Sequence, residues 1–189
     1  MPELQRLRAD HARAVLAFEL ANRAYFATFV SDRGDAFFDH FTEQYNALLA
    51  EQEAGTCVFH VLVDEDGTVL GRFNLYDLKD GTAVLGYRVA QHVAGRGVAT
   101  AAVQELCRLA TARYGLRTLR AATTYDNVAS QKVLTKTGFV PAGPAASPLS
   151  PAIVTPSIRT RGPRQADLPA SRVPGQGPDV PTGSPDSAL

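Results

Sequence analysis

The stretch Gly86-Tyr-Arg-Val-Ala-Gln-His-Val-Ala-Gly-Arg-Gly-Val-Ala-Thr100 contains the change of period that decides the fold. A strand is predicted to end near Val89, and apolar residues at helical spacing from Ala99 to Tyr114 predict a helix. A helix that starts at a glycine-rich turn, here Gly95 and Gly97, presents unpaired N–H groups and partial positive charge to an anion. The stretch therefore predicts a phosphate or pyrophosphate site. Because it lacks the P-loop pattern and does not open a Rossmann unit, the same glycines are also compatible with a purely structural tight turn.

Three strands are predicted before this stretch. Cys57–Val63 and Thr68–Leu78 flank a hairpin turn at Asp64–Gly67, and a second turn at Lys79–Gly81 leads into Thr82–Val89. This spacing predicts an antiparallel meander in the middle of the chain.

Helices are predicted on both sides of the meander. The upstream elements are a short strand at Leu4–Arg8, a helix from Asp10 to Leu20, and a helix that starts at Asp35 and ends at Gly55. The elements after the helix 97–114 are a strand at Leu116–Thr124, a short helix between Asp126 and Gly138, and the apolar pair Phe139-Val140. Alternating strands and helices make part of the sheet parallel. The predicted fold class is α/β (α+β), with a mixed, largely antiparallel sheet flanked by helices.

The charge balance excludes proteins that bind nucleic acid or membrane surfaces through bulk electrostatics. The chain has 19 Lys and Arg against 19 Asp and Glu, and 45% of its residues are hydrophobic, with no run of the roughly 18 apolar residues that span a membrane. No apolar signal region opens the chain, and Cys57 and Cys107 fit neither a disulfide framework nor a metal-ligand spacing. We therefore expect a cytoplasmic monomer or homodimer with no metal, nucleic-acid partner or membrane partner.

The composition changes near residue 142. Eleven of the twelve prolines lie at or after position 141, and Phe139 is the last aromatic residue. A segment rich in Pro, Ser, Ala and Gly buries too little apolar surface to offset the entropy lost on ordering. The sequence therefore predicts one domain over 1–142 and a disordered tail over 143–189. Prolines bracket Ala152–Thr155, which makes it a poor candidate for a strand.

A second motif lies one strand after the glycine-rich turn. The segment Asp126-Asn-Val-Ala-Ser-Gln-Lys-Val-Leu-Thr-Lys-Thr-Gly-Phe139 places Asn127, Ser130 and Leu134 on one face of a short helix. Together the two motifs resemble the GNAT superfamily of acyl-CoA N-acyltransferases, and within it the branch of Rim-type ribosomal-protein N-acetyltransferases. The resemblance covers about residues 3–140, including Asn22-Arg23 and the stretch 32–35.

The resemblance implies a site for acetyl-CoA as co-substrate. In the family, strand residues 87–89 would splay from the next strand, and the Val89 backbone would pair with the pantetheine arm and polarise the thioester carbonyl. The backbone amides that would bind the pyrophosphate belong to Gly95, Arg96, Gly97, Val98, Ala99 and Thr100. Asn127 would contact the pantetheine or an ordered water, and Ser130 would donate a proton to the departing thiolate. The acceptor-side candidates in the N-terminal region are Tyr25, Phe26 and Arg33.

The sequence departs from the family pattern at several positions. Ala94 stands where Gln or Arg is usual, Leu134 where many members have a tyrosine acid, and Val84 where some have a glutamate base. No general base is evident, and His92 is the histidine closest to the expected cleft. The family also closes its sheet with a strand hairpinned to the one at Phe139, and only the proline-rich tail follows here. The last strand is therefore predicted to be missing.

The resemblance therefore predicts that the protein is an acetyl-CoA-dependent N-acetyltransferase. The acceptor amine would attack the thioester directly in a ternary complex, the Val89 amide would stabilise the oxyanion, and water would carry the amine proton away. The branch implies a protein N-terminal amine as acceptor. Two alternatives stay open, a catalytically weak acyl-CoA-binding module and a small-molecule amine acetyltransferase.

Overall fold

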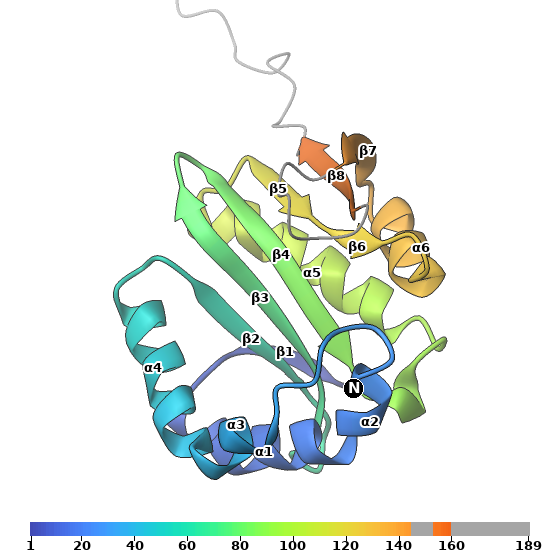
Figure 1. The fold of residues 1–189 in the computed structure, drawn as a ribbon. Coiled ribbons are helices and arrows are strands. Elements are labelled where there is room, and N and C mark those ends of the chain that lie inside the picture. Colours follow the sequence, from blue (N-terminus) through green and yellow to red (C-terminus); the bar gives the residue numbers. More distant parts are fainter. Residues whose placement is uncertain (145–152, 160–189) are drawn as a thin grey trace, which may run out of the picture.

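The computed structural model describes residues 1–144 and 153–159 (Figure 1). The strands are β1 (Glu3–Arg6), β2 (Val58–Val63), β3 (Val69–Lys79), β4 (Thr82–Val89), β5 (Thr118–Ala121), β6 (Thr123–Thr124), β7 (Val140–Pro144) and β8 (Ile153–Arg159). The helices are α1 (Ala12–Ala21), α2 (Arg23–Phe26), α3 (Asp35–Asp39), α4 (Phe41–Glu53), α5 (Val98–Tyr114) and α6 (Val128–Lys136), with 3₁₀ turns η1 (Ala9–His11) and η2 (Gln91–Val93).

The strands form one mixed sheet in the order β1-β2-β3-β4-β5-β8-β6, with β7 paired to β8. The pairs β1–β2, β2–β3 and β3–β4 are antiparallel, so the predicted meander is confirmed. The β4–β5 pair is parallel, because α5 carries the chain back across the sheet. The predicted mixed, largely antiparallel sheet flanked by helices is therefore confirmed.

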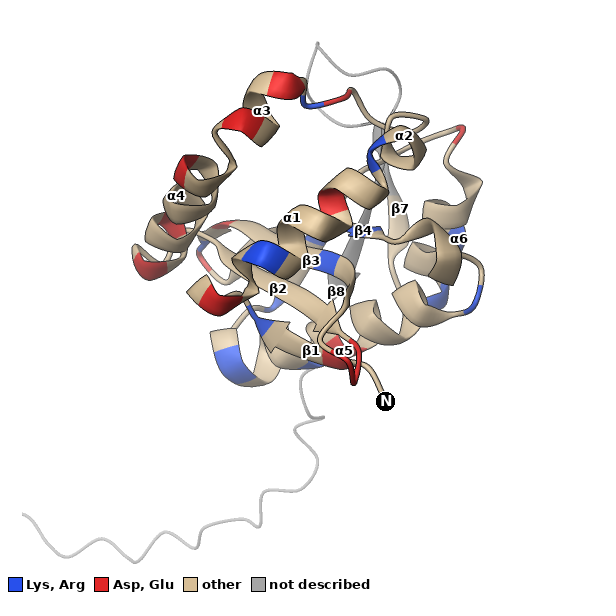
Figure 2. Ribbon diagram, turned by 90° about the horizontal axis from the view of Figure 1, so that it is seen from below, with Lys and Arg blue, Asp and Glu red and all other residues tan. Residues whose placement is uncertain are grey.

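The two faces of the sheet are covered by different helices. Neighbouring residues of β3 point to opposite faces. Arg72 binds Glu19 of α1, whereas His60, the cross-strand neighbour of Phe73, lies 3.0 Å from the Tyr114 hydroxyl of α5. Figure 2 shows α1 crossing the sheet over β2 and β3. The N-terminal helices thus occupy one face, and α5 occupies the other.

The helix predicted from Asp35 to Gly55 is two helices. The chain leaves helical geometry at His40, which has φ −105° and ψ 24°, and α4 begins at the next residue. Phe37 and Phe41 stay in contact across the break, with ring centroids 6.0 Å apart. The helical spacing of the apolar residues continues across the bend at His40, so the sequence pattern did not predict the break.

The prediction that the last strand is missing is wrong. Strand β8 lies antiparallel to β5, where Leu119 faces Ile158, and antiparallel to β7, where Pro141 faces Pro156. Along the edge opposite β7, strand β8 pairs with β5 through residues 157–159 and with β6 through residues 153–154. Pro156 falls between these two pairings, so its missing N–H costs no ladder hydrogen bond to β5 or β6.

The predicted domain boundary changes with this strand. Residues 153–159 belong to the sheet and not to a disordered tail, and the predicted boundary at 142/143 falls within β7. The remainder of the predicted tail, 145–152 and 160–189, lies outside the described residues. Within the described part of the chain, no helix is long and apolar enough to cross a membrane.

Candidate active site

Strands β4 and β5 separate in the middle of the sheet. Their parallel pairing runs only from Thr82–Leu85 against Thr118–Ala121, and no described residue pairs with 86–89 on that side. The Ala90 N–H bonds the Leu70 carbonyl at 2.8 Å, so antiparallel alternation turns the N–H groups of Tyr87 and Val89 away from β3. Two backbone donors of β4 therefore face the gap, as the resemblance implied for Val89.

The glycine-rich turn lies at the end of this gap. Gly95 and Gly97 have φ values of +76° and +80°, which disfavour any side chain, and a Cβ at either would meet no atom within 4 Å. Among the described residues, no acceptor bonds the backbone N–H groups of Val98, Ala99 or Thr100 in the first turn of α5. Unpaired donors, open space and the helix dipole together make an anion site.

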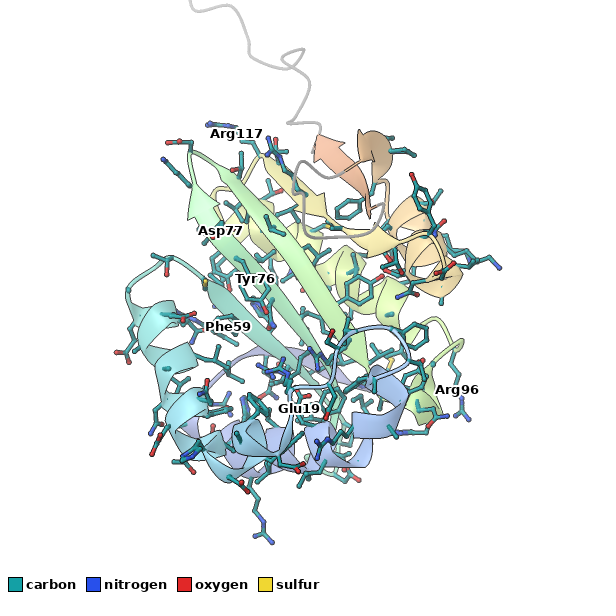
Figure 3. All side chains as sticks on the ribbon, viewed as in Figure 1. Glu19, Phe59, Tyr76, Asp77, Arg96 and Arg117 are labelled. Carbon is teal, nitrogen blue, oxygen red and sulfur yellow. The ribbon has the colours of Figure 1, made fainter. Side chains whose placement is uncertain are left out.

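One cavity of about 190 Å³ connects the gap, the turn and two helices. Seven of the predicted site residues line it, namely Tyr25, Phe26, Val89, Gly95, Ala99, Asn127 and Ser130. Arg96, Gly97, Val98 and Thr100 belong to the same turn and helix start but are not in the lining, and Figure 3 shows the Arg96 side chain extending outward. Arg33 lines a smaller neighbouring cavity.

Ser130 has a hydroxyl partner that sequence reasoning missed. The Tyr87 Oη lies 2.9 Å from the Ser130 Oγ, and Tyr87 lines the same cavity. Burial raises the pKa of the Tyr87 phenol, so it stays protonated at neutral pH. The ring stacks on Phe73, with centroids 5.8 Å apart and planes 6° from parallel, which fixes its position. The available signal was the i, i+2 relation that puts Tyr87 and Val89 on one face of β4.

Asn127 holds the start of the helix that carries Ser130. Its Oδ1 accepts a hydrogen bond from the Ser130 backbone N–H at 3.0 Å, which makes it the N-cap of α6. The predicted contact of Asn127 with pantetheine or water stays a prediction. Leu134, at the position of the family's tyrosine acid, is buried in the core. The hydroxyls of Tyr87 and Ser130 therefore form a hydrogen-bonded, proton-bearing pair in the cavity.

The candidates predicted for the acceptor side lie on α2 and in the segment before α3, next to α1. Tyr25 and Phe26 reach the cavity, and Phe26 packs on Phe18 with ring centroids 5.4 Å apart. Asn22 ties this region to the end of β4, because its Oδ1 accepts a hydrogen bond from the Gln91 N–H at 2.9 Å. The N-terminal helices and the glycine-rich turn are thus held together through one side chain.

The remaining titratable candidates lie outside this cavity. His92 is exposed on the rim of a separate groove of about 830 Å³. Burial lowers the pKa of His60 to about 4 and raises the pKa of Cys107 to about 11, so both are neutral at pH 7. No three His, Cys, Asp or Glu side chains gather into a metal-binding group among the residues that the structure describes. The cavity itself contains no carboxylate or imidazole in its lining.

The family model for the acetyltransferase (GNAT) domain matches residues 3–140. The chain belongs to the GNAT acetyltransferase family. The family resemblance inferred from the two motifs is thereby confirmed. No curated protein sequence gives a significant match to the chain.

Solved structures with the same fold include Rim-type enzymes. The ribosomal-protein-S5-alanine acetyltransferase from Vibrio fischeri is 20% identical, with a TM-score of 0.77 over 85% of this chain and 93% of that chain. RimJ from Mycobacterium smegmatis, in complex with CoA-disulfide, is 22% identical, with a TM-score of 0.73 over 83% and 81%. Spermidine N-acetyltransferase from Vibrio cholerae, in complex with CoA and spermine, is 15% identical, with a TM-score of 0.69 over 84% and 95%. At these identities the similarity establishes the fold of this GNAT acetyltransferase.

Proposed function

We propose that the protein transfers the acetyl group of acetyl-CoA to an α-amine by direct attack in a ternary complex. The observation that carries this proposal is the single cavity onto which the β4 donors, the glycine-rich turn and the Tyr87–Ser130 hydroxyl pair all open. Because the amine and the thioester would be held side by side, proximity supplies much of the rate.

The residues present fit acetyl-CoA. The N–H groups of residues 98–100, which have no acceptor among the described residues, would bind the pyrophosphate together with the backbone of the glycine-rich turn, since both of its glycines leave open space where it would lie. The Arg96 N–H already donates to the Val93 carbonyl at 3.4 Å. The backbone N–H groups that face the gap at Tyr87 and Val89 would pair with the pantetheine arm, and the Val89 donor would stabilise the oxyanion. Bound acetyl-CoA supplies the activated acyl group.

The proton for the departing thiolate would come from the hydroxyl pair. Ser130 Oγ would donate to the sulfur, the Tyr87 phenol at 2.9 Å would replace that proton, and water would reprotonate Tyr87. Because the pKa of Tyr87 is raised, its phenol stays protonated at neutral pH and can donate a proton to Ser130. The role predicted for Ser130 alone thereby becomes a role for two hydroxyls.

The absence of a base in the cavity lining bears on the acceptor. An α-amine has a pKa of about 7.7–8, whereas a lysine amine titrates near 10.4, so far more of an α-amine is neutral at pH 7. An enzyme that deprotonates through water works best with the less basic amine. This favours the α-amine of a peptide or protein N-terminus over a polyamine.

Gly97→Glu tests the cofactor site. It adds bulk and negative charge where the pyrophosphate would lie, so acetyl-CoA should no longer raise the melting temperature. At 100 times its Kd, bound ligand stabilises wild type by about 2.7 kcal/mol, or roughly 5–11 °C for a chain of this size.

Gly55→Glu is the matched control. Gly55 has φ +78° and open space around it, so it suffers the same backbone strain far from the cavity, after α4. It should keep the full acetyl-CoA shift. An equal shift in the Gly97 variant would remove the proposed cofactor site.

A catalytically weak acyl-CoA-binding module is the second candidate. It is favoured by the lack of a general base in the cavity lining. Both candidates bind acetyl-CoA, but only the enzyme releases free thiol faster when an α-amine peptide is added. Binding without amine-dependent thiol release would decide for the module.

A further inference from the structure

Arg88 connects the cavity to a second, smaller one on the acceptor side. It lines both, and the smaller cavity is also lined by Arg33, Phe26 and Phe38. The Arg88 guanidinium lies 5.0 Å from the Phe26 ring centre and donates from Nη1 to Glu19 Oε2 at 3.1 Å. Its side chain keeps 26% of its surface exposed and lines the larger cavity, where a ligand can reach it.

This region carries more positive than negative charge. Glu19 is shared by two guanidiniums, Arg88 and the buried Arg72, whose Nη1 lies 2.6 Å from Oε1. Arg23 is already satisfied, because it pairs with Asp32 and Asp35. Arg33 has no carboxylate partner among the described residues, and its guanidinium lies 4.5 Å from the Phe37 ring centre. Four arginines thus face three carboxylates, and one further anion would balance the charge.

The positive charges of Arg33 and Arg88 favour the binding of an anion. Burial, and then the positive charge of Arg88, lower the pKa of Arg33. Arg33 is nevertheless an exposed residue and lines only the smaller cavity, whose volume of about 10 Å³ is too small for a carboxylate. An anion in the larger cavity would therefore bind Arg88 directly, and Arg33 would add a weaker attraction from the neighbouring segment. The planar guanidinium fork also matches the two oxygens of a carboxylate.

We propose that Arg88 binds a carboxylate of the acceptor in the larger cavity, with the positive charge of Arg33 nearby, so that the preferred acceptor is an α-amine with a carboxylate close to it. The source is either a free amino acid or a peptide with an acidic residue beside its N-terminus. This inference rests on the proposed N-acetyltransferase function and specifies its substrate class. A polyamine brings further positive charge to the same place and is therefore disfavoured.

The test compares acceptors that differ only in one charge. Amine-dependent thiol release is measured with two peptides, Ser-Glu and Ser-Gln at the N-terminus of the same neutral sequence, and with free serine against serinamide, the last two compared at equal concentrations of neutral amine because serinamide is the less basic amine. The wild type should prefer the charged member of a pair by about tenfold or more in kcat/KM. The pair that shows the preference identifies the source of the carboxylate.

The variants are Arg88→Gln and Arg33→Gln, with Arg108→Gln as control. Arg88→Gln should bring the preference close to one by raising KM for the acidic acceptor, and Arg33→Gln should reduce the preference by less, because Arg33 does not line the larger cavity. Arg88→Lys should restore part of it, since the charge returns without the fork. Arg108 pairs with Glu105 on the exposed side of α5, so its variant keeps the wild-type preference.

The acetyl-CoA melting shift and the rate of thiol release together distinguish a loss of folding or activity from a loss of the acceptor preference. Arg88→Gln leaves Glu19 paired with Arg72, and an intact acetyl-CoA melting shift in each variant shows that it is folded. Thiol release at equal rates from charged and neutral acceptors, or variants that slow both equally, would overturn the carboxylate site alone. No thiol release with any acceptor would overturn the proposed function, and the carboxylate site with it.

Discussion

Replacing Glu19 by glutamine removes the carboxylate that holds two arginines against the sheet. Figure 3 labels Glu19 beside the N-terminal helices, and it is 2% exposed. Arg72 is 4% exposed, and its Nε has no hydrogen-bond partner among the described residues. The variant therefore leaves a buried guanidinium with its charge uncompensated.

The cost follows from this burial. Breaking a buried ion pair by removing one partner costs about 3–5 kcal/mol, because the remaining charge stays desolvated. For a chain of this size, about 2–4 °C of melting temperature is lost per kcal/mol, so Glu19→Gln should melt roughly 6–20 °C below wild type. The exposed pair Glu105–Arg108 gives the contrast, since Glu105→Gln should cost about 0.2–0.5 kcal/mol.

Urea unfolding and thermal melts measure both effects. The double variant Glu19→Gln with Arg72→Met removes the buried charge together with its partner, so it should be more stable than Glu19→Gln alone. A Glu19→Gln variant within about 1 kcal/mol of wild type, or no recovery in the double variant, would refute the argument that a desolvated charge sets the cost.

Three other predictions concern the site, the pH dependence and the sheet. Tyr87→Phe and Ser130→Ala should each lower kcat by about a hundredfold with acetyl-CoA binding unchanged; unchanged turnover would show that solvent supplies the proton. His60 has a pKa of about 4 when folded against 6.5 when unfolded, so stability is full above pH 6.5 and falls by about 3 kcal/mol toward pH 4. Urea titrations should show a flatter pH profile for His60→Gln, and an unchanged profile would contradict this. Truncation after Pro144 removes β8 and should cause self-association that light scattering detects, whereas truncation after Arg159 keeps β8 and should not. Equal scattering from the two truncated chains would show that β8 does not prevent self-association.

The meander and the glycine-rich turn could be predicted because their signals are local. Strand alternation and the turn residues lie within a few positions of one another, and Gly95 and Gly97 are required by positive φ at those positions. The motif around Asn127 and Ser130 was likewise readable as one helix face. These elements line the part of the cavity in which we propose that acetyl-CoA binds.

The features that were missed depend on contacts between distant segments. Strand β8 is stabilised by partners on β5 and β7, and Pro156 is tolerated only because of where those pairings end. Tyr87 meets Ser130 across 43 positions, and Glu19 meets Arg72 across 53. Side-chain pairs at such separations leave no periodic pattern in the sequence.

Strand β8 also determines when the sheet can be completed during synthesis. Its partner β5 is made about forty residues earlier, which corresponds to roughly 2–8 s of translation. During that interval the open edge of β5, with Leu119 on it, has no permanent partner in the nascent chain. The parallel β4–β5 pair also forms slowly, since it joins segments separated by a whole helix. The ribosome-bound intermediate is therefore the state in which this chain is most exposed to chaperones and to aggregation.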